Sequence, residues 1–338
     1  MNLEIPKSRS YDEALSVAPG NLGLRREAQR HAAFVRAKGF ASLNNSRPPE
    51  DGGAAALRHR SPKSRSAIAR ERAVVARAAL VDCQLCAHHC GVNRLAGETG
   101  LCHAGADARF FLAQTEVTDE LELIPTFAVA LSGCDLRCDF CITGAESWNP
   151  RAGQDFSAPE MATKAKAAIA SGAKTVMILG GEPTIHLPAA LEFVSHLPDD
   201  AKLVWKTNAH GAAQARALLD GMFDVWLADY KFGNDDCAQR LAKVSDYTRV
   251  VRENLLWAHE HSELIVRHLL MPGHLDCCWR PVADWLVQNL PGVKVNLRSG
   301  FWPAWKSSRH AELRGTVSDD ESRRAWQIAE DLGLNLIP

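Results

Sequence analysis

Three closely spaced cysteines, Cys134, Cys138 and Cys141, have the clearest chemistry in this chain. Their C-x3-C-x2-C spacing puts three thiolates on one short loop, which suits three corners of a [4Fe-4S] cluster and leaves the fourth iron without a protein ligand. An iron of that kind can bind a small molecule, so the loop indicates chemistry rather than electron storage. A zinc site would need a fourth Cys or His close by, and none follows at a zinc-finger spacing.

A second motif follows a short apolar segment, residues 175–179. This segment leads into Gly180, Gly181 and Glu182, the pattern of a buried parallel strand that ends in a tight turn. The glycines let the backbone approach a ligand closely, and the carboxylate carries a charge suited to an ammonium group. Alone, Gly-Gly-Glu fits an ordinary strand-to-helix turn. Beside the cysteine loop it favours a binding site.

Together the two motifs are similar to those of radical SAM enzymes, over about residues 120–310. The resemblance implies that Cys134, Cys138 and Cys141 hold the [4Fe-4S] cluster and that its open iron binds the amino and carboxylate groups of S-adenosylmethionine. It further implies that reductive cleavage of this cofactor gives methionine and a 5′-deoxyadenosyl radical, which abstracts a hydrogen atom from a substrate. The protein would then bind, orient and exclude water while the cofactor supplies the chemistry.

The same resemblance assigns roles to further residues. Phe140 would lie near the adenine, and Gly180, Gly181 and Glu182 would hold the methionine ammonium. Thr-Asn, Asp-x-Lys and Arg-x4-Pro-Gly patterns at the ends of later strands are similar to those of pyruvate formate-lyase activating enzymes. By that resemblance five residues would face S-adenosylmethionine: Thr207, Asn208, Asp229, Lys231 and Arg267. Lys231 and His268 are the candidate catalytic residues, with His268 expected to contact substrate.

Apolar segments of strand length alternate with helical segments through the middle of the chain. This alternation predicts an α/β fold with a parallel sheet and outer helices, and the resemblance implies the partial (β/α)6 barrel of radical SAM type. The candidate strands are residues 127–131, 175–179, 203–207, 225–229, 264–269 and 293–297. The candidate helices are residues 159–170, 187–196, 212–219, 238–243, 249–259 and 281–290. Both motifs fall at the carboxyl ends of strands, where such barrels carry their chemistry.

A second cysteine set precedes the barrel and comprises Cys83, Cys86, Cys90 and Cys102. Four thiolates within twenty residues predict a compact metal-binding segment, which suits either structural zinc or a second iron–sulfur cluster. Neighbouring histidines are close enough to replace a cysteine: His88, His89 and His103. A similar cysteine-rich prelude occurs in a branch of radical SAM proteins related to pyruvate formate-lyase activating enzymes.

Several residues depart from the activating enzymes. Lys206 stands where those enzymes commonly carry an Asp that helps bind a monovalent cation, and residues 301–310 lack a Pro-Tyr-His sequence. The motifs therefore predict a radical generator without specifying a glycyl-radical partner. The remaining cysteines, Cys237, Cys277 and Cys278, fit a redox-active or auxiliary-cluster role less well than ordinary buried thiols.

Composition and charge divide the 338-residue chain. Residues 1–78 hold 15 Lys and Arg against 7 Asp and Glu, and the remainder holds 24 against 33. We expect a basic, partly flexible extension (1–78), a cysteine-rich segment (79–120), the barrel (121–310) and a C-terminal helix and tail (311–338). No apolar segment predicts a membrane span or a secretory signal, and ten cysteines without such a signal favour the cytoplasm.

Two classes of function are consistent with these features. The first is a radical SAM enzyme that acts on a protein, peptide or small molecule, with a glycyl-radical enzyme as one candidate and flavodoxin or ferredoxin as electron donor. The second is a structural iron–sulfur or zinc protein that binds nucleic acid through its basic extension. Few aromatic residues interleave the basic ones, so a solvated extension against the acidic main domain is the simpler interpretation.

Overall fold

Six apolar segments form the parallel core of one sheet in the computed structural model, which describes residues 63–337. Their bounds are β2 (Thr126–Leu131), β4 (Thr175–Gly180), β5 (Leu203–Thr207), β6 (Val225–Asp229), β7 (Glu263–Leu269) and β8 (Lys294–Arg298). Each pairs in parallel with the next. All six strands predicted from the sequence are confirmed. Residues 1–62 of the expected basic extension lie outside the described residues.

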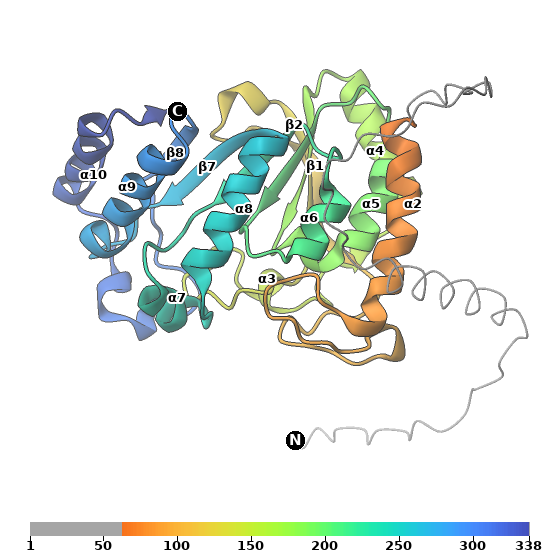
Figure 1. Ribbon diagram of the computed structural model, residues 1–338, viewed down its shortest axis with the longest axis horizontal. Coiled ribbons are helices and arrows are strands. Elements are labelled where there is room, and N and C mark those ends of the chain that lie inside the picture. Colours follow the sequence, from red (N-terminus) through yellow and green to blue (C-terminus); the bar gives the residue numbers. More distant parts are fainter. Residues whose placement is uncertain (1–62, 338) are drawn as a thin grey trace, which may run out of the picture. The chain divides into compact units, whose positions relative to one another are not determined.

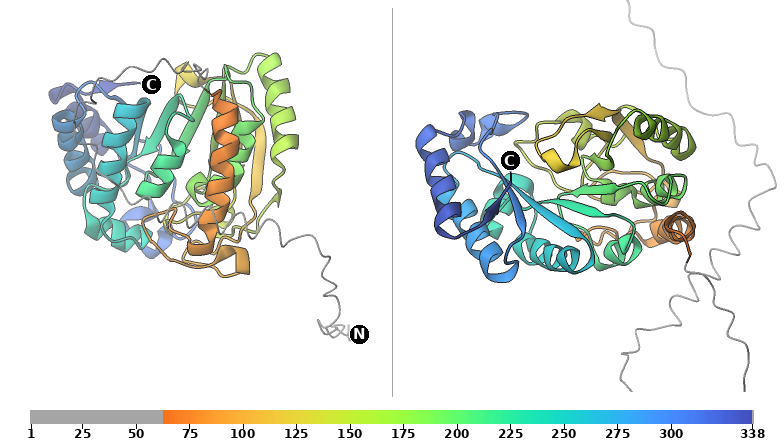
Figure 2. Two further views of the ribbon diagram at one scale, coloured as in Figure 1. Left: turned by 45° about the vertical axis from the view of Figure 1, so that its right-hand side comes forward. Right: turned by 90° about the horizontal axis from the view of Figure 1, so that it is seen from above.

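Three further strands extend this core to nine. The strand β1 (Arg109–Glu116) pairs antiparallel with β2, the two-residue β3 (Gln154–Asp155) pairs with β1, and β9 (Asn335–Leu336) pairs with β8. The sheet order is β3-β1-β2-β4-β5-β6-β7-β8-β9, so the first and last strands do not join. The expected partial barrel is therefore confirmed as an open, curved sheet (Figure 2).

Helices cover the outer, convex face of the sheet (Figures 1 and 2). They include α4 (Ala158–Ala170), α5 (Leu187–Ser195), α6 (Ala213–Leu219), α7 (Asp235–Ala242), α8 (Tyr247–His261), α9 (Arg280–Asn289) and α10 (Asp319–Asp331). The short helix α3 (Ala145–Trp148) follows the cysteine loop. The predicted helices of the main domain are confirmed, with ends shifted by up to three residues.

Strand alternation separates an apolar interior from a polar rim. Side chains on a strand point alternately to opposite faces, and the larger core cluster lies between the sheet and its outer helices. On the inner face a second cluster includes Met177, Val204, Leu227 and Ile265. Further along the same face, toward the carboxyl ends of the strands, the residues become charged. This edge is where the two sequence motifs lie.

The helix α2 (Arg65–Ala78) packs along α5, although the sequence assigned it to the basic extension. Ser64 caps its first turn by accepting a hydrogen bond from Ala67 N. Its arginines bind the main domain: Arg65 pairs with Asp224 at 2.9 Å, and Arg72 donates to the carbonyl oxygen of Leu218 at 3.1 Å. The described residues, 63–337, belong to one compact unit.

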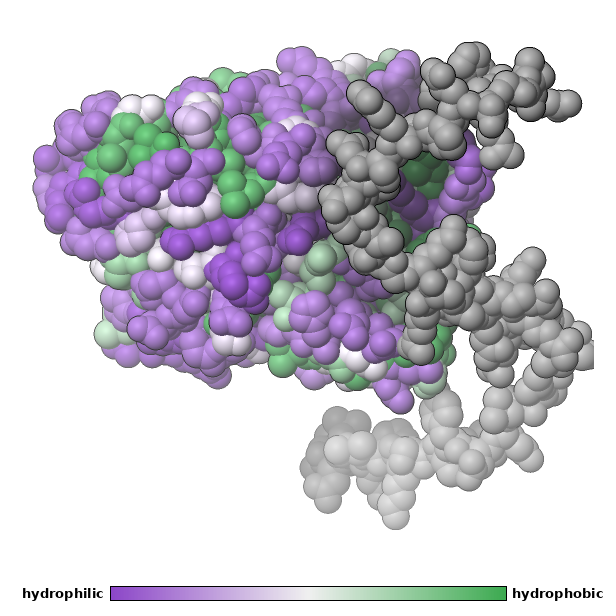
Figure 3. Space-filling model, in the orientation of Figure 1, coloured by the Kyte–Doolittle hydropathy of each residue, from purple (hydrophilic) through white to green (hydrophobic). Residues whose placement is uncertain are grey.

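The surface of the described part is largely hydrophilic on the side drawn in Figure 3, with an apolar patch in the area of α9 and α10. Within the described residues, no helix is both long and apolar enough to span a membrane. The cytoplasmic location inferred from composition stays a prediction.

Candidate functional site

The three-cysteine loop follows β2 and is held in place by backbone hydrogen bonds. Arg137 N donates to Ala242 O at 3.1 Å and Asp139 N donates to Leu241 O at 2.8 Å, so the end of α7 anchors the loop. Cys134 and Cys138 are buried and Cys141 is partly exposed. The loop therefore lies at the carboxyl edge of the sheet with one thiol accessible.

Burial determines the protonation of these thiols. It raises the pKa of the Cys138 thiol to about 12, and it raises the pKa of the Cys134 thiol well above the usual value, with the nearby Asp135 charge adding to the effect. Without metal both groups are neutral thiols. Binding of iron must displace their protons, so assembly of a metal centre here releases protons to solvent.

The Gly-Gly-Glu segment is bonded to the start of the cysteine loop. Gly181 N donates to Leu131 O and Glu182 N donates to Gly133 O, both at 2.9 Å. A Cβ on Gly181 would lie 2.0 Å from Gly133 O, closer than any side chain tolerates. Glycine is thus required for the two segments to lie side by side.

The Glu182 carboxylate joins its own turn to the end of β5. It accepts hydrogen bonds from Thr184 Oγ1 at 2.6 Å, from Thr207 Oγ1 at 2.8 Å and from Asn208 N at 2.7 Å. Burial, with the charge of Asp135, raises the pKa of Glu182 to about 7. The structure thus brings Thr207 and Asn208 to the motif, as the sequence suggested, and gives Glu182 protein partners of its own.

Asp135 links the cysteine loop to the cysteine-rich segment. Its carboxylate accepts from Asn208 Nδ2 at 2.7 Å and from His210 Nδ1 at 2.8 Å. Its carbonyl oxygen lies 3.0 Å from His88 Nε2, and the rings of His88 and His210 meet edge to face. Burial works against ionisation of this carboxylate, but the bonds from His210 and Asn208 hold its pKa below the usual value.

Charged side chains at the carboxyl ends of β6 and β7 form ion pairs. Lys231 Nζ lies 2.5 Å from Asp229 Oδ2, and Arg267 binds both carboxylate oxygens of Glu120. The Arg267 guanidinium is therefore occupied by a protein partner, which sequence reasoning did not anticipate. Lys231 lies near the cysteine loop, because the next residue, Phe232, packs against Phe140 of that loop.

Lys206 has no such partner: no carboxylate of the described residues lies within ion-pair distance of its ammonium group. Burial, reinforced by the charge of Arg267, lowers the pKa of Lys206 to about 8. A lysine with this pKa can act as a proton donor or as a cation for an acidic ligand.

Two other predicted residues are packed against protein. Phe140 is buried against the rings of Phe232 and Phe301. His268 lies on the face of β7 opposite to Arg267, with Nδ1 2.7 Å from Tyr230 O and its ring against Trp279 in the helix layer. That position is on the helix side of the sheet, whereas a substrate would meet the inner face. We therefore do not carry His268 forward as a substrate contact.

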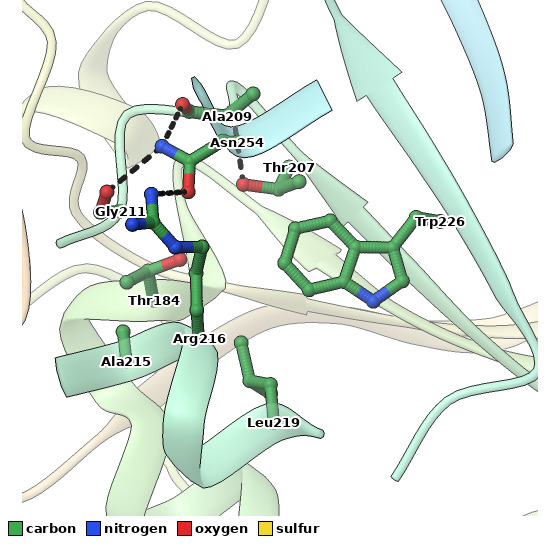
Figure 4. Close-up of a pocket in the computed structure, with 9 residues that line it drawn as sticks. All are labelled: Thr184, Thr207, Ala209, Gly211, Ala215, Arg216, Leu219, Trp226 and Asn254. Atoms are coloured by element: carbon green, nitrogen blue, oxygen red, sulfur yellow. Dashed lines mark hydrogen bonds between the residues drawn. The ribbon is translucent and has the colours of Figure 1, made fainter. Parts of the chain in front are cut away.

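A small hollow near this edge has a structural rather than a binding character (Figure 4). It lies between α6 and the loop after β5, and Asn254 from α8 crosses it. Asn254 Nδ2 donates to Ala209 O and Gly211 O, both at 2.9 Å, and Arg216 donates to Asn254 Oδ1 at 2.9 Å. These hydrogen bonds hold the loop that carries Asn208 and His210 in place.

Comparison with known proteins decides the family. The family described as "Radical SAM superfamily" matches residues 129–286. An uncharacterized protein of Methanocaldococcus jannaschii is 31% identical over 266 residues, which cover 76% of this chain and 76% of that protein. The chain belongs to the radical SAM superfamily. The 7-carboxy-7-deazaguanine synthase of Methanothermobacter thermautotrophicus is 31% identical over 103 residues, 30% of this chain and 40% of the synthase.

Among solved structures, the chain matches SuiB of Streptococcus suis bound to the precursor peptide SuiA. The two chains are 16% identical with a TM-score of 0.48, and the match covers 60% of this chain and 46% of SuiB.

Membership of the superfamily implies a [4Fe-4S] cluster and S-adenosylmethionine. The donor set of the cysteine loop fits such a cluster. Its three cysteines stand on one short loop, which keeps their thiols near one another. Among the described residues, two groups have ligand atoms all within 4.8 Å of one another, and neither contains this trio. Thiolates that bind different irons of one cube need this wider separation, which a single ion would not allow.

The cysteine-rich segment docks beside the radical SAM motifs. Cys86 pairs with Gly211 in an isolated bridge, and Ala87 N donates to His210 O at 3.0 Å. Arg94 anchors the segment by donating to Ile185 O at 2.7 Å and to Cys83 Sγ at 3.7 Å. Cys83, Cys86 and Cys102 are buried and Cys90 is exposed. Figure 1 shows this segment, in orange, below the carboxyl ends of the strands.

The structure also reveals residues that the sequence did not single out. Glu120, Asp135 and His210 are buried and bonded to predicted site residues. Glu120 and His210 lie outside the recognisable motifs, and Asp135 follows Cys134 directly. None of the three stands at a spacing that would identify it as a site residue. A charged residue inside an otherwise apolar segment is the one sequence signal for such groups, and Glu120 stands in a run of acidic residues that hides it.

Proposed function

We propose that this protein is a radical enzyme in which Cys134, Cys138 and Cys141 hold a [4Fe-4S] cluster with an open iron for S-adenosylmethionine. When bound, the pair supplies reductive cleavage of the sulfonium and a carbon radical that takes a hydrogen atom from a substrate. The observation that carries the proposal is the side-by-side placement of the cysteine loop and the Gly-Gly-Glu segment at the carboxyl edge of the parallel sheet.

The chain's own residues would position the cofactor. Gly180 and Gly181 expose backbone at the end of β4, and the Glu182 carboxylate, braced by Thr207 and Asn208, would add negative charge for the methionine ammonium. Lys231 and Asp229 form an ion pair at the end of β6, and the charge of Lys231 favours the thiolate form of Cys138. Aromatic packing around Phe140 would keep water from the loop.

For the substrate we favour a peptide or protein. Two exposed tryptophans, Trp302 and Trp305, have 69% and 42% of their surface accessible and follow Phe301, which packs against Phe140 of the cluster loop. Trp305 covers Gly144 and packs against Trp148, and Ile142, next to Cys141, is 77% exposed. Apolar side chains left in solvent beside a reaction site are typical of a surface that binds a macromolecule. The unpaired Lys206 would attract an acidic group of that partner.

Deoxyadenosine formation tests the proposal. The protein would be reconstituted anaerobically with iron and sulfide, reduced with dithionite or flavodoxin, and assayed for 5′-deoxyadenosine with S-adenosylmethionine present. We expect product from the wild type and none from Cys138→Ala, because two thiolates cannot hold the cube. Cys90→Ala, in the cysteine-rich segment, is the matched control and should keep cleavage.

Cleavage by Cys138→Ala equal to that of the wild type would refute the assignment. Absence of product from a wild-type protein that carries its iron would favour the alternative, a structural metal protein. In that case salt-sensitive binding of nucleic acid, lost on removal of residues 1–62, would be the expected activity.

A further inference from the structure

Four potential metal ligands from two distant segments meet beside the barrel. Cys237 lies on α7, and His274, Cys277 and Cys278 lie in the segment after β7. Their sulfur atoms and the Nδ1 atom of His274 all lie within 4.8 Å of one another. Cys237, His274 and Cys278 are buried, and Cys277 is partly exposed. The proposed radical chemistry uses none of these residues.

The spacing of these atoms matches a tetrahedron around one ion. With Zn–S bonds of about 2.3 Å and Zn–N bonds of about 2.0–2.1 Å, tetrahedral ligands lie ~3.8 Å apart for two sulfurs and ~3.6 Å apart for sulfur and nitrogen. Cys277 Sγ lies 3.9 Å from Cys237 Sγ and 4.0 Å from Cys278 Sγ. His274 Nδ1 lies 3.6, 3.3 and 3.4 Å from the sulfurs of Cys237, Cys277 and Cys278.

Other interpretations fit these distances less well. Thiolates of an iron–sulfur cube bind different irons and cannot lie this close together. A disulfide requires sulfurs about 2.0 Å apart, and it would leave a third thiol and an imidazole nitrogen directed at the same point without a reason. Ordinary buried thiols, the interpretation that the sequence favoured, do not explain why all four donors converge.

Neighbouring side chains contact the four potential ligands in the way that residues around a metal site do. Two groups face the other nitrogen of His274: Arg240 Nη2 lies 3.3 Å from Nε2 and Glu312 Oε1 lies 3.7 Å from it. An imidazole that binds metal through Nδ1 keeps its proton on Nε2, and the carboxylate is the partner that can accept it. Arg240 binds the same Glu312 carboxylate and fixes its position. Asn234 Nδ2 donates to Cys237 Sγ at 3.4 Å and to Cys277 O at 2.6 Å. Amide donors to a sulfur stabilise its thiolate form.

The local backbone is adapted to this convergence. Residues Leu275–Trp279 form a single π-helical turn, a rare form that occurs mostly at functional sites. Gly233 contacts this turn so closely that a Cβ would lie 2.4 Å from Cys278 O. Glycine there lets the segment before α7 approach the turn, which brings Cys237 to its partners.

We propose that Cys237, His274, Cys277 and Cys278 bind one structural zinc ion. Three soft thiolates and an imidazole suit zinc, and four protein ligands close its tetrahedral shell, as in structural sites. Binding replaces three S–H bonds by Zn–S bonds and releases the three protons to solvent, with no change of oxidation state. The partly exposed Cys277 provides the access route for the ion.

The zinc would clamp α7 to the segment after β7. The end of α7 accepts the backbone hydrogen bonds of Arg137 and Asp139 in the cysteine loop. Zinc at one end of this helix would therefore steady the iron-binding loop at the other. Loss of zinc should accordingly lower the retention of iron as well.

Metal counting on the full-length, anaerobically purified protein tests this site. We expect the wild type to hold one zinc more per chain than Cys277→Ser. His259→Ala, an exposed histidine on α8 outside both cysteine sets, is the control and should keep the zinc. His274→Cys, which converts the ligand set to four thiolates, should keep it as well. Glu312→Gln should retain zinc but lose it to a chelator at a 10- to 100-fold lower concentration.

A second measurement does not depend on folding of the ligand variants. X-ray absorption at the zinc edge of Cys83→Ala/Cys90→Ala, in which the N-terminal set keeps only two thiols, should show three sulfur neighbours at about 2.3 Å and one nitrogen at about 2.0 Å. Zinc content unchanged by Cys277→Ser, iron in place of zinc, or a disulfide joining Cys237 to Cys277 in the purified protein would each overturn the proposal.

Discussion

At the scale of single residues, the site depends on which buried charges have partners. Glu182 and Asp135 are satisfied by several donors each, and Arg267 is satisfied by Glu120. Lys206 differs, because no carboxylate of the described part of the chain pairs with its ammonium group. A buried charge without a partner costs stability and is retained where it serves a ligand.

Lys206→Met tests whether the buried ammonium group lowers the free energy of unfolding, because this effect should depend on pH. The pKa of Lys206 is lowered from 10.5 to about 8, so between these values the unfolded chain binds more protons and the free energy of unfolding rises with pH. The cost applies in full below pH ~8. Lys206→Met should therefore raise the free energy of unfolding at neutral pH by roughly 1–3 kcal/mol.

Denaturant unfolding of the reconstituted protein at several pH values measures this effect. The gain from Lys206→Met should shrink as the pH rises through the window, while the exposed Lys202→Met shows little change at any pH. A gain that stayed constant with pH would mean that burial of the ammonium is not its source.

At the scale of helices and strands, much of the fold was predictable. The six central strands are apolar runs because both of their faces are covered, and such runs stand out from their surroundings. The strand β1 was missed because its residues are only half-buried and mix Arg, Gln, Thr and Glu with apolar ones. The strand β9 was missed because two residues form no periodic pattern.

The candidate site was predictable where its residues are adjacent in sequence. Cys134, Cys138 and Cys141 share one loop, so their spacing indicates the chemistry directly. Cys237 lies 37 residues before His274, and nothing local indicates that α7 and the turn after β7 meet. The position of His268 disfavours the role expected for it, because strand alternation directs its side chain to the helix side while its neighbour Arg267 occupies the inner face.

Asn254→Ala tests how α8 holds the loop after β5. The carbonyl oxygens of Ala209 and Gly211 would lose their buried donor, which should lower the free energy of unfolding by about 1–3 kcal/mol. Because the loop carries Asn208 and His210, affinity for S-adenosylmethionine should also fall. Denaturant unfolding and equilibrium dialysis measure the two effects. Asn289→Ala, an exposed amide on α9, is the control, and equal results for both variants would contradict the role of Asn254.

At the scale of the whole molecule, the helix α2 packs against the barrel. Its buried residues Ala69 and Ala76 face the main domain, and Arg65 and Arg72 bind it. Some of the basic side chains among the first 78 residues therefore bind the main domain of the same chain. This favours an extension that lies against the acidic main domain over one that binds nucleic acid.

Two truncations separate these contributions. A chain that begins at residue 63 keeps α2 and its contacts with α5. A chain that begins at residue 79 exposes α5 and should unfold at least roughly 5 °C lower. Calorimetry of both chains gives the answer, and equal midpoints would show that α2 adds nothing to the stability of the barrel.

The central claim is that the cluster of Cys134, Cys138 and Cys141 has an open iron that binds S-adenosylmethionine. Electron paramagnetic resonance of the reduced protein tests it most directly, with the cofactor's amino nitrogen isotopically labelled. We predict that S-adenosylmethionine changes the signal of the reduced cluster and that the label produces a hyperfine coupling. A reduced cluster whose signal is unaffected by saturating cofactor would contradict the account.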